Sequence, residues 1–131
     1  MIGLDTNVLV RYIVQDDAVQ SPRATRFIEK ECSAAHPGYV GLVTLAELVW
    51  VSESCYDATR VEIAGLLRRI LGTKQLRVQE AETVWKALRL FETGKADFAD
   101  FLVENIARGA GCTSTVTFDK TAAKAGMTLL G

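Results

Sequence analysis

The sequence predicts an α/β fold, a three-layer α/β/α sandwich with a central parallel β-sheet. Short apolar runs that suit buried strands alternate along the chain with longer segments whose apolar residues recur at helical spacing. Strands separated by helices imply right-handed crossovers, and these produce a parallel sheet that helices cover on both faces.

Length and composition suit a single domain. The chain has 131 residues, of which 49% are hydrophobic and only two are proline, so it can bury a core of its own. It contains no internal repeat, low-complexity tract or linker. We therefore expect one domain over residues 1–131.

Several features favour a cytoplasmic protein that enters no membrane. The N-terminus lacks a basic segment followed by a long apolar stretch, and no window reaches about 18 uninterrupted apolar residues. The three cysteines are far apart and lack C-x-x-C spacing, which disfavours a zinc site and a disulfide framework. The single histidine, His36, is expected in a loop, so histidine-based catalysis is also disfavoured.

The first half of the chain begins with an apolar run, Met1 to Leu4, which predicts a buried strand. A helix over 8–14 follows, for which Thr6 or Asn7 is a candidate N-cap. Ser21 before Pro22 is typical of a helix start and predicts a helix of three turns. The other expected elements of this half are a strand at 39–43, a helix from residue 44 through 51, a helix at 59–71 and a strand at 76–78.

The second half predicts a helix over 80–92, with Gly94 as its C-cap, and a helix from Asp97 to about residue 110. A strand at 112–118, a short helix at 120–125 and a last strand at 127–130 complete it. Trp50 and Trp85 lie in apolar helical patterns and are assigned to the core rather than to base stacking.

Acidic residues stand where a parallel sheet places its ligands. Ligands bind such sheets beyond the carboxyl ends of the strands, so the polar residues that follow apolar runs are the candidates. Asp5, Glu47 and Asp119 are such residues. The helix from Asp97 adds Asp100, because both lie in its first turn and can point toward the same end of the sheet.

Carboxylates brought close together repel, and a divalent cation relieves that repulsion. All the candidate ligands are oxygens, which favours Mg²⁺ or Mn²⁺ over zinc. Such a site suits phosphodiester hydrolysis, in which metal ions stabilise phosphate charge and generate hydroxide near neutral pH. The net charge of −1 gives no overall attraction to nucleic acid, so a basic rim would have to come from Arg11, Arg68, Arg69, Lys74, Lys95, Arg108, Lys120 and Lys124.

Each acid also has a purely structural interpretation. Thr44 to Glu47 matches a capping box, in which Glu47 bonds back to the helix start, and the same pattern recurs at Thr59 to Glu62 without any other functional hint. Asp97 suits an N-cap. Asp100 can favour the dipole of the same helix, and Asp119 can be an ordinary turn residue. The weight of the hypothesis lies in the set of four acids.

Three polar residues are candidates for a supporting role. Thr6 and Asn7 can orient the Asp5 carboxylate or cap the following helix, and the two roles are compatible. Thr117 can hold the backbone near Asp119 or a phosphate, or can simply fill the strand. The residues alone leave these roles open. Glu104 falls in the same sector of its helix as Asp97 and Asp100, within about 60°.

Four segments, taken in order, resemble the PIN-domain toxins of VapBC toxin–antitoxin pairs, the VapC family. They are Ile2-Gly3-Leu4-Asp5-Thr6-Asn7-Val8-Leu9, the apolar helix around Glu47, Ala96-Asp97-Phe98-Ala99-Asp100 with Ile106-Ala107, and Thr115-Val116-Thr117-Phe118-Asp119. The resemblance covers essentially the whole chain.

This resemblance implies a PIN-like fold and a Mg²⁺- or Mn²⁺-dependent endoribonuclease. By position, Asp5, Glu47, Asp100 and Asp119 match the acidic quartet of the family, and Asp97 resembles its accessory acid. Family members cut structured RNA, especially loops of transfer RNA and ribosomal RNA. They usually form homodimers, and a cognate VapB-like antitoxin inhibits them by inserting a C-terminal segment, often with a basic side chain, into the acidic site.

Three rival interpretations remain at this point. A receiver-type phosphoacceptor domain needs an Asp on its central strand, and the strand expected at 39–43 has none. A haloacid-dehalogenase-like phosphatase needs Asp-x-Asp after the first strand, where this chain has Asp5-Thr6-Asn7. A catalytically silent PIN-like binding scaffold is disfavoured by the intact quartet.

Overall fold

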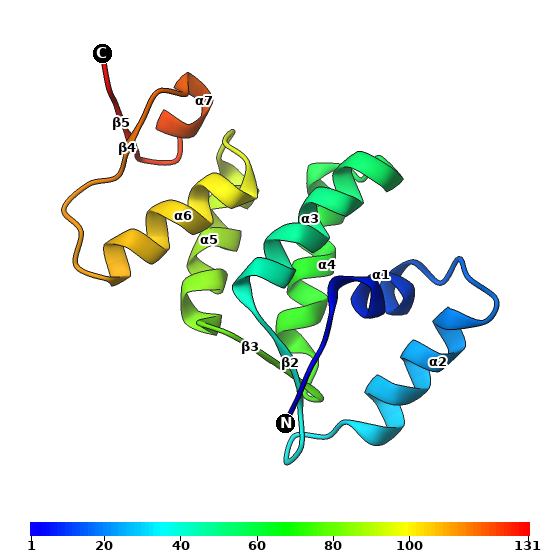
Figure 1. The fold of residues 1–131 in the computed structure, drawn as a ribbon. Coiled ribbons are helices and arrows are strands. Elements are labelled where there is room, and N and C mark those ends of the chain that lie inside the picture. Colours follow the sequence, from blue (N-terminus) through cyan, green and yellow to red (C-terminus); the bar gives the residue numbers. More distant parts are fainter. The chain divides into compact units, whose positions relative to one another are not determined.

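The computed structural model describes all residues 1–131 and divides into two compact units, Met1–Gln79 and Glu80–Gly131. The first unit contains β1 (Ile2–Gly3), α1 (Thr6–Val14), α2 (Gln20–Arg26), the π-helix η1 (Phe27–Glu31), β2 (Gly38–Val40), α3 (Leu42–Tyr56), α4 (Arg60–Gly72) and β3 (Leu76–Val78), as Figure 1 shows. The second contains α5 (Ala81–Thr93), α6 (Phe98–Gly109), β4 (Val116–Thr117), α7 (Lys120–Ala123) and β5 (Thr128–Leu129).

Every strand pair in both units is parallel. In the first unit the strand order is β1-β2-β3, with Ile2 opposite Gly38 and Gly38 opposite Leu76. In the second, β4 pairs with β5, with Val116 opposite Thr128. Helices intervene between successive strands, so the predicted α/β class with parallel strands is confirmed.

The core of the first unit is formed by side chains from α1, η1, β2, α3 and α4. Its most deeply buried side chains are Leu9, Ile28, Val40, Leu45, Leu48, Ile63, Leu67 and Ile70. Gly38 permits a close approach of β2 to the end of β1, because a Cβ there would lie 2.8 Å from Cδ1 of Leu4. This packing fixes the residue that follows Leu4, namely Asp5.

The second unit is built on the pairing of α5 with α6. Phe91 and Phe98 meet edge to face, with ring centroids 5.9 Å apart. Gly94 is the C-cap of α5, as expected, but its φ of −97° shows that positive φ is not the reason for glycine. A Cβ at Gly94 would lie 2.8 Å from the backbone carbonyl oxygen of Leu90 and 2.5 Å from Cζ of Phe101, so a larger residue would collide with both. No helix is long and apolar enough to cross a membrane.

Several expected helix starts and strands differ from the structure. The helix expected to begin at Ser21 begins at Gln20, because the Asp17 carboxylate accepts hydrogen bonds from the N–H groups of Val19 (2.9 Å) and Gln20 (2.6 Å). The first strand lies where it is expected, at Ile2–Gly3, but its expected burial is wrong, since Ile2 is 57% exposed and only Leu4 of this run is buried. The strands expected at 39–43, 112–118 and 127–130 are only two or three residues long, and the short helix expected at 120–125 ends at Ala123.

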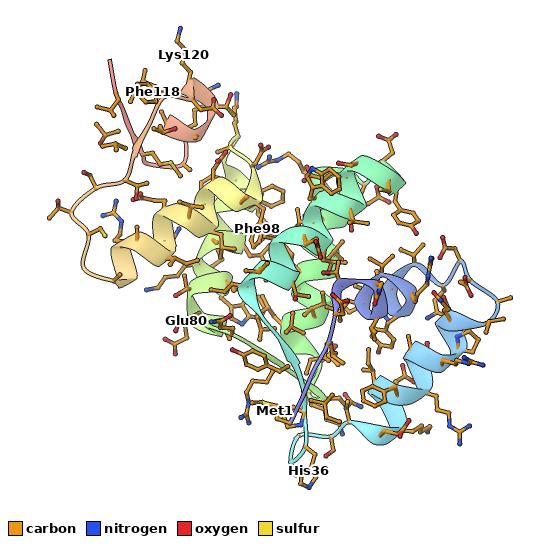
Figure 2. The ribbon with its side chains drawn as sticks, viewed as in Figure 1. Met1, His36, Glu80, Phe98, Phe118 and Lys120 are labelled. Atoms are coloured by element: carbon orange, nitrogen blue, oxygen red, sulfur yellow. The ribbon has the colours of Figure 1, made fainter.

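The aromatic assignments are wrong for Trp50, which is 62% exposed on α3, while Trp85 is half-buried. His36 lies exposed in the loop before β2, as expected (Figure 2). Phe118, labelled in the same figure, is 82% exposed between β4 and Asp119. The second unit therefore carries a large apolar side chain directly beside a candidate ligand.

Candidate metal centre

Asp5 begins α1 at the end of the first strand. It is the N-cap of that helix, and its Oδ1 accepts a hydrogen bond of 2.8 Å from the Thr6 N–H. Oδ2 of Asp5 accepts no hydrogen bond from the protein, and the residue is exposed. The expectation that Thr6 or Asn7 caps this helix is wrong, because both lie inside its first turn. Asp5 can therefore cap the helix and still offer an oxygen to a cation.

Thr6 connects Asp5 to Glu47. While its N–H donates to Asp5, its hydroxyl donates a hydrogen bond to Oε1 of Glu47 on α3. Thr6 is buried, whereas both acids are exposed. One fixed residue thus holds one oxygen of each carboxylate and leaves the other oxygen of each free.

The capping-box interpretation of Glu47 is excluded. The helix α3 begins at Leu42, two residues before Thr44, and its first N–H is bound by Oε1 of Gln79 at 3.0 Å. The matching pattern at Thr59 does form a capping box, in which the Thr59 N–H donates to Oε1 of Glu62 at 2.9 Å. The Thr-x-x-Glu pattern therefore forms a capping box at Thr59 but not at Thr44, and Glu47 has no capping role.

Asp5 and Glu47 line one surface hollow of about 480 Å³ in the first unit. Its other lining residues are Thr6, Asn7, Val10, Arg11, Val51, Cys55 and Tyr56. Arg11 is the single basic residue among them. Asn7 and Arg11 also line a larger hollow of about 560 Å³ beside β1 and α2, but neither candidate acid lies there. Of these two hollows, only the one of about 480 Å³ is lined by candidate ligands.

The second unit brings together the remaining acids. Asp97 is the N-cap of α6, and its N–H donates to Oδ2 of Asp100 at 3.3 Å. Burial raises the pKa of Asp100, the hydrogen bond from Asp97 lowers it, and the negative charges of Asp97 and Asp119 raise it further, so that the net shift is upward. The start of α6 and the end of β4 therefore place Asp100 and Asp119 within electrostatic range of each other.

Asp119 is held by its neighbours in the chain. Its Oδ1 accepts a hydrogen bond of 2.8 Å from the Thr121 N–H and so caps α7. Its own N–H donates to Oγ1 of Thr117 at 3.0 Å. Thr117 thus fixes the backbone at Asp119, and Oδ2 of Asp119 accepts no hydrogen bond.

Glu104 does not join this group although it shares a helix sector with Asp97 and Asp100. Its side chain is buried, and its Oε1 accepts a hydrogen bond of 3.1 Å from Nε of Arg108. It lies a full turn beyond Asp100 and is packed within the second unit. Helical spacing alone was therefore insufficient to separate an exposed acid from a buried one.

The donor chemistry fits a hard divalent cation, but neither unit alone gathers three or more His, Cys, Asp or Glu side chains around one position. The first unit supplies Asp5 and Glu47, each with a free oxygen. In the second unit, the like charges around Asp100 disfavour its ionised form, a disadvantage that a cation would remove. Sequence reasoning did not identify Asp16, which binds Arg11 at the hollow, or Tyr56, whose hydroxyl donates to Asp16. Only the folded positions of these side chains reveal that role.

Comparison with known protein families places this geometry in context. The model of the PIN domain family matches residues 2–126, which include every candidate acid. None of the curated proteins compared with the chain matches it. PIN domains are generally metal-dependent nucleases, commonly bind nucleic acid and often pair with antitoxins. Because the match spans nearly the whole chain, this protein belongs to the PIN domain family.

Proposed function

We propose that this chain is a Mg²⁺- or Mn²⁺-dependent endoribonuclease of the VapC type, which hydrolyses phosphodiester bonds in structured RNA such as transfer RNA or ribosomal RNA loops. One observation carries the proposal: Thr6 holds Asp5 through its N–H and Glu47 through its hydroxyl, at one open hollow. Glu47 has no capping role that would otherwise explain its position.

The proposed metal ligands are Asp5, Glu47, Asp100 and Asp119, acting together in one domain that spans residues 1–131. The proposed supporting residues are Thr6, Asn7, Asp97 and Thr117. A bound Mg²⁺ or Mn²⁺ supplies positive charge that stabilises the phosphate and lowers the pKa of water. The hydrogen bonds from Thr6 and from the Asp97 N–H would hold carboxylates in place and leave them a free oxygen. The bond from the Asp119 N–H to Thr117 would hold the backbone that carries the fourth carboxylate.

The same acids suggest how the activity is restrained. A VapB-like antitoxin with a basic side chain would find exposed carboxylates at Asp5 and Glu47. We further propose that the chain works in the cytoplasm as a homodimer, in line with the VapC resemblance. An inhibitory antitoxin peptide would be expected to compete with Mn²⁺ or RNA at this hollow.

The test is cleavage of a mixed pool of transfer RNA and ribosomal RNA by the purified protein. Cutting in Mg²⁺ or Mn²⁺ is expected, and both EDTA and Asp5→Asn should abolish it. The matched control is Asp57→Asn, an exposed position outside the hollow with a φ of 53° that asparagine also adopts readily. Cutting that persists in EDTA would contradict a metal-dependent nuclease, and no cutting by folded wild-type protein would favour a catalytically silent PIN-like binding scaffold.

A further inference from the structure

Arg11 is the only cation on the wall of the hollow that holds Asp5 and Glu47. An RNA strand that enters this hollow brings several negative phosphates beside two carboxylates. A metal ion can compensate the charge at the scissile bond, but the neighbouring phosphates need a cation from the protein. Among the residues that line the hollow, only Arg11 supplies such a cation.

The guanidinium of Arg11 is fixed in position. Its Nε donates to Oε1 of Gln20 at 2.9 Å, and its Nη1 donates to Oδ1 of Asp16 at 3.0 Å. The hydroxyl of Tyr56 donates to the other oxygen of Asp16 at 3.2 Å. Tyr56 is the last residue of α3, the helix that also carries Glu47. The position of Arg11 is therefore tied to the element that positions a candidate ligand.

This anchoring leaves part of the guanidinium unused. Arginine has five N–H donors, and only one on Nε and one on Nη1 are engaged here. Nη2 donates to no protein group, and the side chain is 31% exposed. Both N–H groups of Nη2 and the second N–H of Nη1 therefore remain able to donate to phosphate oxygens.

Arg11 is also displaced along α1 from the acids. It lies six positions after Asp5 in the sequence, which corresponds to roughly 9 Å of helix rise. Asp16 and Gln20 hold its side chain at the far end of that interval. This separation suits a phosphate next to the scissile one.

We infer that Arg11 binds an RNA phosphate that neighbours the scissile bond and so positions the strand over Asp5 and Glu47. The inference rests on the proposed function, because it assigns a substrate contact to the same hollow. Asp16 and Tyr56 orient Arg11, and Arg11 itself touches the substrate without ligating metal. The rival explanation is that Arg11 only joins α1 to the loop at Asp16 and to α2.

The experiment measures the binding of a fluorescein-labelled single-stranded RNA of 12 nucleotides by anisotropy, with Ca²⁺ in place of Mg²⁺, over a range of salt concentrations. Gel analysis verifies that the probe stays intact. Arg11→Gln is compared with Arg26→Gln, because Arg26 is an exposed arginine on α2 that lines neither hollow.

We expect Arg11→Gln to bind about tenfold more weakly than wild type. The slope of log affinity against log salt should fall by about 0.7 in magnitude, which corresponds to one phosphate contact on a single strand.

A purely structural role predicts a different result. Arg11→Gln would then lower the melting temperature but leave the salt slope equal to that of Arg26→Gln, and this outcome overturns the inference. If Arg11→Gln does not fold, Arg11→Lys keeps the charge beside Asp16 and loses the planar fork. Threefold or greater weakening relative to Arg26→Lys supports the inference, and equal affinity overturns it.

The two proposals fail separately. Binding that depends on Arg11, without any cutting in Mg²⁺ or Mn²⁺, removes the nuclease and keeps the phosphate site. Metal-dependent cutting with the same salt slope in wild type and Arg11→Gln keeps the nuclease and removes the phosphate site. Failure of wild-type protein to bind the probe overturns the phosphate site, whatever the cleavage result.

Discussion

At the scale of single residues, loss of the Thr6 hydroxyl is expected to weaken metal binding. Replacing Thr6 with Val keeps the shape of a buried side chain but removes the hydrogen bond to Glu47. Because groups that orient metal ligands commonly contribute 10- to 100-fold in metal affinity, we expect Thr6→Val to weaken Mn²⁺ binding by about that factor. Isothermal titration calorimetry measures the change.

Thr6→Ser is the matched control, since it retains the hydroxyl and should keep most of the affinity. Unchanged Mn²⁺ affinity in Thr6→Val, with folding verified by circular dichroism, would show that Glu47 needs no orientation or ligates nothing. The same titration on Glu47→Gln separates these two possibilities, because a large loss of Mn²⁺ affinity indicates a ligand and an unchanged affinity shows that Glu47 ligates nothing.

The sequence indicated that Thr6 belongs to the site but not what it does there. Thr6 is expected to orient Asp5, and its backbone N–H does so by donating a hydrogen bond to the Asp5 carboxylate. The hydroxyl instead reaches Glu47, 41 residues later, and no local pattern reveals a partner so distant. Trp50 shows the same limit, because α3 is apolar on nearly all sides and periodicity cannot say which face is exposed.

At the scale of elements, the two Thr-x-x-Glu patterns should respond differently to the same substitution. Thr59→Ala removes the acceptor for the Glu62 N–H and should lower the free energy of unfolding by about 1 kcal/mol. Thr44→Ala should change the free energy of unfolding by less than about 0.5 kcal/mol, because Thr44 lies inside α3 and caps nothing. Urea unfolding of both variants distinguishes them, and equal losses would contradict the assigned start of α3.

The Thr59 capping box also makes stability depend on pH. The backbone N–H of Thr59, and then its side chain, lower the pKa of Glu62 below its usual value of 4.5. A lowered folded pKa means that the ionised form stabilises the fold above pH 4.5 and that this contribution disappears as pH falls through the folded value. Glu62→Gln should therefore be less stable than wild type at pH 7, and the difference should close toward pH 3.

Element boundaries were predicted well where a cap lies in the sequence beside its helix. Thr59 and Asp97 are N-caps at the expected places, and the strand over 76–78 has the expected bounds. The start of α2 was misplaced because Asp17 binds N–H groups two and three residues ahead of it. The start of α3 was misplaced because its first N–H is bound by Gln79, from beyond α4. A cap supplied from a distant segment leaves no local pattern.

At the scale of the whole molecule, the alternation of short apolar runs with amphipathic helices was sufficient to predict parallel strands and the α/β class. Of the four acids that the sequence expects at one site, the structure places Asp5 and Glu47 at one hollow of the first unit and joins Asp97 to Asp100 in the second. Convergence of all four acids is a separate claim, because it depends on long-range packing that neither periodicity nor capping encodes. That claim stays a prediction, and metal binding is the means to test it.

A metal ion that requires acids from both Met1–Gln79 and Glu80–Gly131 should stabilise the chain as a whole. At 100 times its dissociation constant, Mn²⁺ should raise the free energy of unfolding by about 2.7 kcal/mol, because it binds only the folded protein. Asp5→Asn in the first unit and Asp100→Asn in the second should each remove this gain. Glu82→Gln, an exposed acid at the start of α5, should retain it. Thermal unfolding with Mn²⁺ and with EDTA measures the difference. If Asp100→Asn keeps the full gain while Asp5→Asn loses it, the first unit holds the metal without Asp100, and the four acids do not form one centre.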